Sequence, residues 1–150
     1  MDDTPDRLYG WGYQGRSVAD LLAFAQARGV RAVIDVRLNP VSRKRGFSKR
    51  LLTAALEEEG IVYVHLPALG NPRDNRDGFA VPGTAAGRAA HARYLDEVLD
   101  TDAGRHALGE LVSMRDQGPV LTLCYEADQV CCHRHLVLSA VADLAEPVCA

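Results

Sequence analysis

The chain has 150 residues, of which 47% are hydrophobic and 25% are charged, and its formal net charge is −3. This length and composition predict one globular domain with its own hydrophobic core. No apolar run approaches the roughly 18 residues of a membrane span, and the acidic first residues do not resemble a signal peptide. We therefore expect a cytoplasmic protein without a membrane partner, in which the four cysteines are thiols. The negative net charge argues against a protein that coats nucleic acid over its whole surface.

Four segments have the pattern of β-strands, and helical patterns follow them. Strands are expected at residues 7–13, 31–37, 61–66 and 119–124. Helices are expected from Ser17 to Gly29, from Ser48 to Gly60, at about 88–100 and 102–116, and after the Cys131–Arg134 cluster. Alternating strands and helices are typical of βαβ units. We therefore predict a single-domain, three-layer α/β/α, Rossmann-like fold with a mainly parallel sheet of about four to five strands. Residues 1–6 are expected to be a frayed tail.

The segments that follow the strands carry almost all of the chemically informative residues. In a parallel sheet the C-terminal ends of the strands share one edge, where ligands bind in such folds. That edge would collect residues 12–17, 35–48, 65–76 and 124–134. Their convergence predicts a polar pocket there.

The first of these segments is a glycine-containing turn into a helix. Gly15, Arg16 and Ser17 would stand at the N-terminus of that helix, where unpaired backbone N–H groups favour an anion. A tight turn with a helix cap explains the same residues equally well.

The second segment contains a basic loop, Arg37–Arg50, with six cations and no acid. Such a loop suits phosphate groups or a nucleic-acid backbone, and a solvated basic loop is the alternative. Phe47 could stack on a base, and two serines supply hydroxyls. Its candidate ligand-binding residues are Arg37, Ser42, Arg43, Lys44, Phe47 and Ser48. Asp35 lies two residues before Arg37 and therefore on the same side of the strand, either as its ion-pair partner or as part of the chemistry.

The third segment begins with His65 near a strand end. A histidine there is either a hydrogen-bonded core residue or a ligand-binding group. The turn that follows carries Asn71, Arg73 and Arg76, which we predict to contact the ligand. The remaining polar connection, up to Gly87, suits a mobile lid.

The fourth segment carries the candidate catalytic residues. Cys132 would stand near a helix N-terminus beside His133 and Arg134, and all three influences favour a reactive thiolate. Glu126 could act as an acid, a base or a ligand-binding group. Cys124 ends an apolar strand and is expected in the core. Cys124, Cys132 and His133 lack the closely spaced cysteine pair of structural zinc sites, so we predict no metal and no other cofactor.

These segments also resemble a known family. Residues 12–17, 33–48, 60–70 and 123–134 are similar, in this order, to motifs of the DUF488 family, and the resemblance spans about residues 7–146. Cys132 matches the single cysteine that precedes His-Arg in the family, whereas Cys131 is additional. The name stands for a domain of unknown function, so the resemblance implies kinship without a reaction. A shorter stretch, Val33–Arg37, is also similar to rhodanese-type domains.

Three hypotheses follow from these residues. The first is an enzyme, such as a hydrolase or transferase, or a binding protein for a phosphate-bearing ligand, either a nucleotide or nucleic acid. Glu126 would supply acid–base chemistry, with Cys132 and His133 as nucleophile or orienting groups, and Arg134 would contact phosphate. The second is a non-catalytic nucleic-acid-binding or regulatory module. The third is a thiol-redox or metal-responsive protein that uses Cys131 and Cys132.

Overall fold

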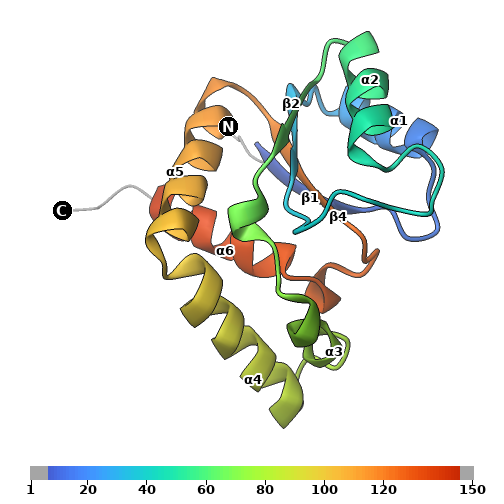
Figure 1. The fold of residues 1–150 in the computed structure, drawn as a ribbon. Coiled ribbons are helices and arrows are strands. Elements are labelled where there is room, and N and C mark those ends of the chain that lie inside the picture. The colour runs from blue at the N-terminus through green and yellow to red at the C-terminus, as the bar shows by residue number, and fades with distance from the viewer. Residues whose placement is uncertain (1–6, 146–150) are drawn as a thin grey trace.

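The computed structural model describes residues 7–145 and shows an α/β protein built on one parallel sheet (Figure 1). The strands are β1 (Leu8–Gly12), β2 (Ala32–Asp35), β3 (Val62–His65) and β4 (Val120–Cys124). Their order is β1-β4-β2-β3, and every neighbouring pair is parallel. The predicted Rossmann-like fold is therefore confirmed, with four strands in the described part of the chain. The frayed tail predicted at residues 1–6 lies outside the described residues.

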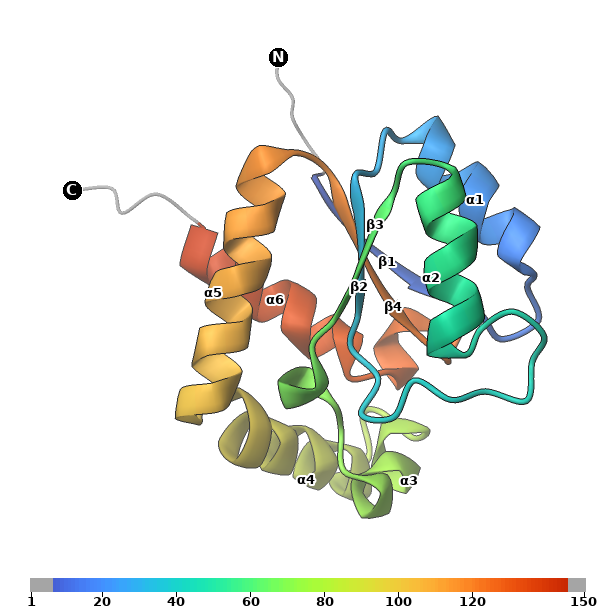
Figure 2. The ribbon, with the colours of Figure 1, turned by 45° about the horizontal axis from the view of Figure 1, so that its top comes forward.

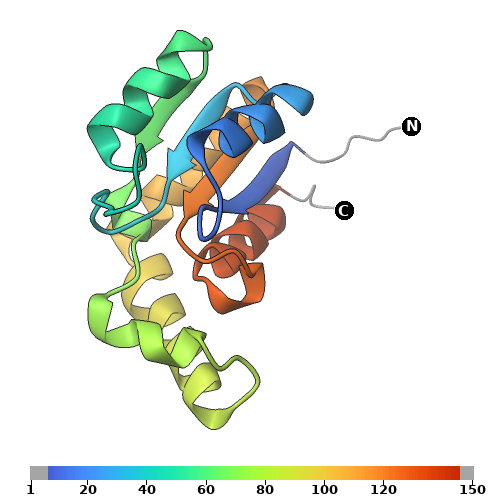
Figure 3. The ribbon, with the colours of Figure 1, turned by 90° about the vertical axis from the view of Figure 1, so that its right-hand side faces the viewer.

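Helices cover both faces of this sheet. Helices α1 (Val18–Ala27) and α2 (Lys49–Glu58) lie on one face, and α5 (Asp102–Gln117) and α6 (Arg134–Ala145) lie on the other (Figure 2). Two further helices, α3 (Arg76–Phe79) and α4 (Ala85–Tyr94), extend beyond the sheet (Figure 3). The predicted three layers are thus present.

The two central strands explain why the sheet is covered on both faces. Every residue of β2 and β4 is buried, as expected for strands that carry apolar side chains without alternation. Successive side chains point to opposite faces. Val33 therefore packs in the core beneath α1 and α2, and Ile34 packs in the core on the α5 and α6 side.

The long connection after β3 is more structured than a polar loop. It contains a 3₁₀ turn at Arg73–Asn75 followed directly by α3. Asn75 and Phe79 are buried, and Asn75 donates a hydrogen bond to the carbonyl of Ala90 in α4 (3.0 Å). This segment is therefore packed against α4, and the mobile lid stays a prediction.

The boundaries of the next helices differ from those predicted. Helix α4 begins at Ala85, three residues earlier than expected, because the Thr84 hydroxyl accepts a hydrogen bond from the Gly87 amide. It continues into a π-helical turn at Leu95–Leu99. Thr101 then caps α5 in the same manner, which explains the predicted break.

Within residues 7–145, no helix combines the length and the apolar character needed to cross a membrane.

Candidate functional site

A pocket of about 290 Å³ lies at the C-terminal edge of the sheet. It is lined by Tyr13 after β1, by residues of the basic loop after β2, by Asn71, Arg76 and Phe79, and by residues between Cys124 and His133 after β4. All four strand ends therefore contribute to one pocket, as the parallel sheet predicted.

The predicted site residues divide into two groups. Those that line the pocket are Arg37, Ser42, Arg43, Asn71, Arg76, Glu126, Cys132 and His133. Those outside its lining are Gly15, Arg16, Ser17, Asp35, Lys44, Phe47, Ser48, His65, Arg73 and Arg134. Most of the second group have structural contacts that explain their positions.

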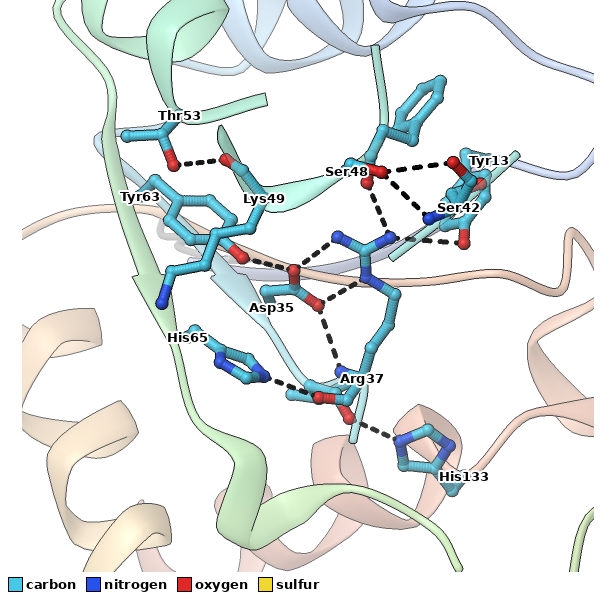
Figure 4. Close-up of polar contacts among 12 residues, drawn as sticks. Tyr13, Asp35, Arg37, Ser42, Ser48, Lys49, Thr53, Tyr63, His65 and His133 are labelled. Carbon is cyan, nitrogen blue, oxygen red and sulfur yellow. Dashed lines mark hydrogen bonds and ion pairs between the residues drawn. The ribbon is translucent and has the colours of Figure 1, made fainter. Parts of the chain in front are cut away.

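Asp35 and Arg37 form a buried ion pair at the end of β2 (Figure 4). The Asp35 carboxylate accepts hydrogen bonds from Arg37 Nε (2.8 Å) and Nη2 (2.6 Å) and from the Tyr63 hydroxyl. Burial disfavours the charged guanidinium, but the hydrogen bond and charge of Asp35 outweigh it and raise the pKa of Arg37. Of the two interpretations of this pair, the internal ion pair is confirmed.

Arg37 also attaches the basic loop to the sheet. Its Nη1 donates to the carbonyl of Phe47 (2.7 Å) and to the Tyr13 hydroxyl (3.3 Å). The Phe47 ring is fully buried and stacked on Tyr13, with 4.5 Å between ring centroids. The prediction that Phe47 stacks on a ligand is therefore wrong, because its ring belongs to the core.

Two histidines hold the backbone that follows β2 (Figure 4). His65 Nε2 lies 2.8 Å from the carbonyl oxygen of Arg37, and His133 Nε2 lies 2.8 Å from that of Val36. A carbonyl oxygen only accepts hydrogen bonds, so each Nε2 carries a hydrogen. His65 is thus hydrogen-bonded, as one of its two interpretations predicted, although its side chain is only partly buried.

Two serines fold the basic loop onto itself. The Ser48 hydroxyl accepts a hydrogen bond from the Ser42 amide (3.0 Å) and donates one to the Ser42 carbonyl (3.1 Å). Ser48 occupies the N-cap position of α2, as predicted, but its side chain makes no capping hydrogen bond there. The pair instead shapes the loop beside Arg43.

Beyond Tyr13, the predicted residues of the turn after β1 do not line the pocket. The Ser17 hydroxyl accepts from the Asp20 amide, and the Asp20 carboxylate accepts from the Ser17 amide (2.8 Å), which completes a capping box. Arg16 donates to the Gly12 carbonyl. The helix-cap interpretation of this segment is confirmed, and the Ser17 amide is already paired with the Asp20 carboxylate.

The loop after β4 is held from inside the protein. Arg134 is 1% exposed and donates to the carbonyls of Glu126 (2.6 Å) and Ala127 (3.4 Å). The loop also packs closely on β1, where a methyl group at Gly12 would overlap the Glu126 carbonyl. Arg134 therefore fixes the position of Glu126. Contrary to the prediction that it contacts a phosphate, its guanidinium is not available to a ligand.

The surroundings of Cys132 do not favour a thiolate in the metal-free protein. The side chain is 1% exposed, and its Sγ lies 3.7 Å from His133 Nδ1. Burial, followed by the hydrogen bond and charge of Cys124, raises the pKa of the Cys132 thiol well above its ordinary value. Burial thus opposes the predicted effect of the neighbouring histidine and helix, and the nucleophilic role of Cys132 stays a prediction.

The pocket belongs to a region shared with other proteins. The model of a family described as "Domain of unknown function DUF488" matches residues 17–141. The chain belongs to this family. In this DUF488 protein the match includes every residue that lines the pocket except Tyr13. No curated protein and no solved structure matches the chain significantly.

Sequence reasoning missed several residues of the DUF488 pocket. Tyr13 and Tyr125 line it, and their rings meet edge to face with 5.3 Å between centroids. Asn39 also lines it. Tyr13 and Tyr125 each follow a strand directly, and Asn39 lies four residues after the end of β2, so position in the chain was the available signal. Cys124 is buried, as predicted for a core residue, yet it contributes to the pocket lining as well.

Proposed function

We propose that this DUF488 protein binds a small phosphate-bearing molecule, no larger than a mononucleotide, in the pocket at the sheet edge. The pocket volume of about 290 Å³ lies at the lower end of the range for small-molecule sites, about 300–1,000 Å³. Three arginines and one carboxylate line this space. Arg37 is paired with Asp35, so two guanidinium groups and the carboxylate remain for a ligand with an anionic end and a reactive polar end.

The arrangement of Arg43 and Arg76 carries this proposal. Both are exposed and line the pocket, and they come from separate segments, the basic loop and α3. Among residues 7–145, neither guanidinium has an ion-pair or hydrogen-bond partner, in contrast to Arg37. Two such cations can bind one phosphate through charge-assisted hydrogen bonds. Asn71 and Ser42 also line the pocket and can add neutral hydrogen bonds.

Glu126 is the proposed acid or base. Its side chain is half-buried and lines the pocket, and its backbone carbonyl accepts a hydrogen bond from Arg134, which holds the residue in place. A positioned carboxylate beside a bound ligand can transfer a proton to or from a reacting group. The reaction class that fits is hydrolysis or group transfer at the phosphate-bearing ligand, with Glu126 essential for turnover and dispensable for phosphate binding.

Calorimetric titration with nucleoside monophosphates and with the matching nucleosides tests the binding. We expect the monophosphates to bind and the nucleosides to bind much more weakly. The double variant R43A/R76A should lose at least tenfold in affinity, because each charge-assisted hydrogen bond contributes about 1.5–3 kcal/mol. The variant R45A/R50A removes the same charge outside the pocket lining and should bind normally. Equal losses of affinity in the two double variants would contradict binding of the phosphate in the pocket.

The exposed face of the basic loop favours a second candidate, a nucleic-acid contact. Arg43, Arg45, Lys49 and Arg50 are all exposed within eight residues of chain. Binding of single-stranded RNA or DNA through this face would weaken steeply with salt. The variant R45A/R50A should reduce this nucleic-acid binding at least as much as R43A/R76A does. This outcome distinguishes it from monophosphate binding in the pocket, which R45A/R50A should leave unchanged.

A further inference from the structure

We infer that Cys124, Cys132 and His133 form a binding site for a zinc-like divalent metal ion at the base of the pocket, with one coordination position open to it. The two Sγ atoms and one histidine nitrogen all lie within 4.8 Å of one another, and all three residues are buried. This inference is independent of the phosphate proposal, because it requires no ligand other than the metal.

The spacing of the three atoms fits a metal ion. A tetrahedral zinc ion, with bonds of about 2.3 Å to sulfur and about 2.0 Å to nitrogen, places sulfur and nitrogen ligands about 3.5 Å apart. In the protein, His133 Nδ1 lies 3.9 Å from Cys124 Sγ and 3.7 Å from Cys132 Sγ. These two distances need to shorten by only a few tenths of an ångström. The two sulfurs lie within 4.8 Å of each other, whereas the same ion places them about 3.8 Å apart, so metal binding also requires the cysteine side chains to approach each other by up to about 1 Å.

The orientation of His133 is the one that metal binding requires. Its Nε2 donates to the Val36 carbonyl (2.8 Å), which leaves Nδ1 as the nitrogen that faces both sulfurs. In the neutral ring, Nδ1 then carries the lone pair. Histidine ligands commonly donate their other nitrogen to a backbone carbonyl in this way, and the contact fixes both tautomer and ring orientation.

The fold brings these three residues together although their spacing in the sequence differs from the paired-cysteine motif of structural zinc sites. Cys124 ends β4, and Cys132 and His133 immediately precede α6. Arg134 closes the intervening loop by its hydrogen bond to the Glu126 carbonyl. Two thiolates and one divalent ion have no net charge, which reduces the cost of burying the thiolates.

The set resembles a catalytic rather than a structural site in its number of ligands. Structural zinc sites use four protein ligands, whereas catalytic sites use three and bind water or substrate in the fourth position. All three residues line the pocket, so the fourth position is accessible from it. Glu126 Oε1 lies 4.0 Å from Cys124 Sγ, so with a metal ion bound its carboxylate would stand beside the set and could exchange a proton with a ligand in the fourth position.

Cobalt titration of the metal-free, reduced protein tests the site directly. We expect one Co²⁺ per chain, with thiolate-to-cobalt charge-transfer absorption and the intense visible bands of a tetrahedral ion, and competition by Zn²⁺. The variants C124S, C132S and H133A should each lose at least a hundredfold in affinity. The variant C131S is the matched control, because Cys131 also lines the pocket but lies outside the cluster, with its thiol directed to Asp128. It should bind Co²⁺ normally.

Three results would overturn the inference. The first is wild-type protein that shows no charge-transfer absorption at one equivalent of Co²⁺ while its circular dichroism is that of a folded protein. The second is an equal loss of binding in C131S. The third is a disulfide between Cys124 and Cys132 in protein purified under reducing conditions. The wild-type titration keeps the test decisive if a buried-cysteine variant does not fold.

Discussion

Replacing Asp35 by Ala should destabilise the protein strongly, because it leaves Arg37 charged and unpaired inside the protein. Asp35 is 0% exposed and Arg37 is 5% exposed. The carboxylate accepts hydrogen bonds from the Arg37 amide, from two guanidinium nitrogens and from the Tyr63 hydroxyl. Breaking a buried pair from one side typically costs about 3–5 kcal/mol. We expect a loss of this size in the free energy of unfolding.

Urea unfolding of single and double variants measures this loss. R37M alone should also be destabilising, but D35A/R37M should lose less than the sum of the two, with a coupling of about 2 kcal/mol. Glu97, in the exposed ion pair with Arg93, is the control, and E97A should leave the urea midpoint unchanged. A loss below about 1 kcal/mol for D35A, or additive single effects, would refute the assigned role of the pair.

Three further perturbations test other parts of the structure. G12A should lower the free energy of unfolding, measured with urea, by about 1–3 kcal/mol, because the added methyl overlaps the Glu126 carbonyl. G109A in α5 has open space around it and should not destabilise the protein. Equal behaviour of the two variants would contradict the packing of Gly12. Burial and the hydrogen bond to Asp35 raise the pKa of Tyr63, so the stability advantage of wild type over Y63F should hold at neutral pH and fall as the pH rises above about 10; a constant difference would argue against the contact. In metal-free protein, iodoacetamide should modify Cys131 much faster than Cys132, which is 1% exposed, and peptide mass spectrometry would reveal the reverse order.

The sequence was most informative where local patterns determine structure. The strand patterns at residues 31–37 and 119–124 predicted two strands of a mainly parallel sheet, and β2 and β4 form there as parallel strands. The capping pattern of Ser17 and Asp20 predicted the start of α1, and both hydrogen bonds are present. These features depend on residues a few positions apart, so they can be recognised in a single sequence.

The errors concern residues whose role depends on distant partners. Phe47 and Arg134 look like ligand-binding groups in their local sequence, beside other cations and polar residues. Phe47 is instead buried against Tyr13, 34 positions earlier, and Arg134 is used to close the loop that carries Glu126. The sequence also gave no indication that β4 would lie between β1 and β2.

The cysteines show the same limit. The spacing between Cys124 and Cys132 differs from that of paired-cysteine zinc motifs, and the sequence argument therefore predicted no metal site. The spacing does not reveal that a closed loop brings both sulfurs to within hydrogen-bonding distance of His133 Nδ1. The sequence likewise does not reveal that Cys132 is 1% exposed, since burial depends on the tertiary structure.

A crystal structure with a bound nucleoside monophosphate would test the proposed function most directly. The proposal predicts the phosphate within hydrogen-bonding distance of both Arg43 and Arg76, with the rest of the ligand directed towards Glu126. A phosphate held by Arg45 and Arg50 on the outer face of the basic loop, or at the N-terminus of α1 beside Ser17, would contradict it.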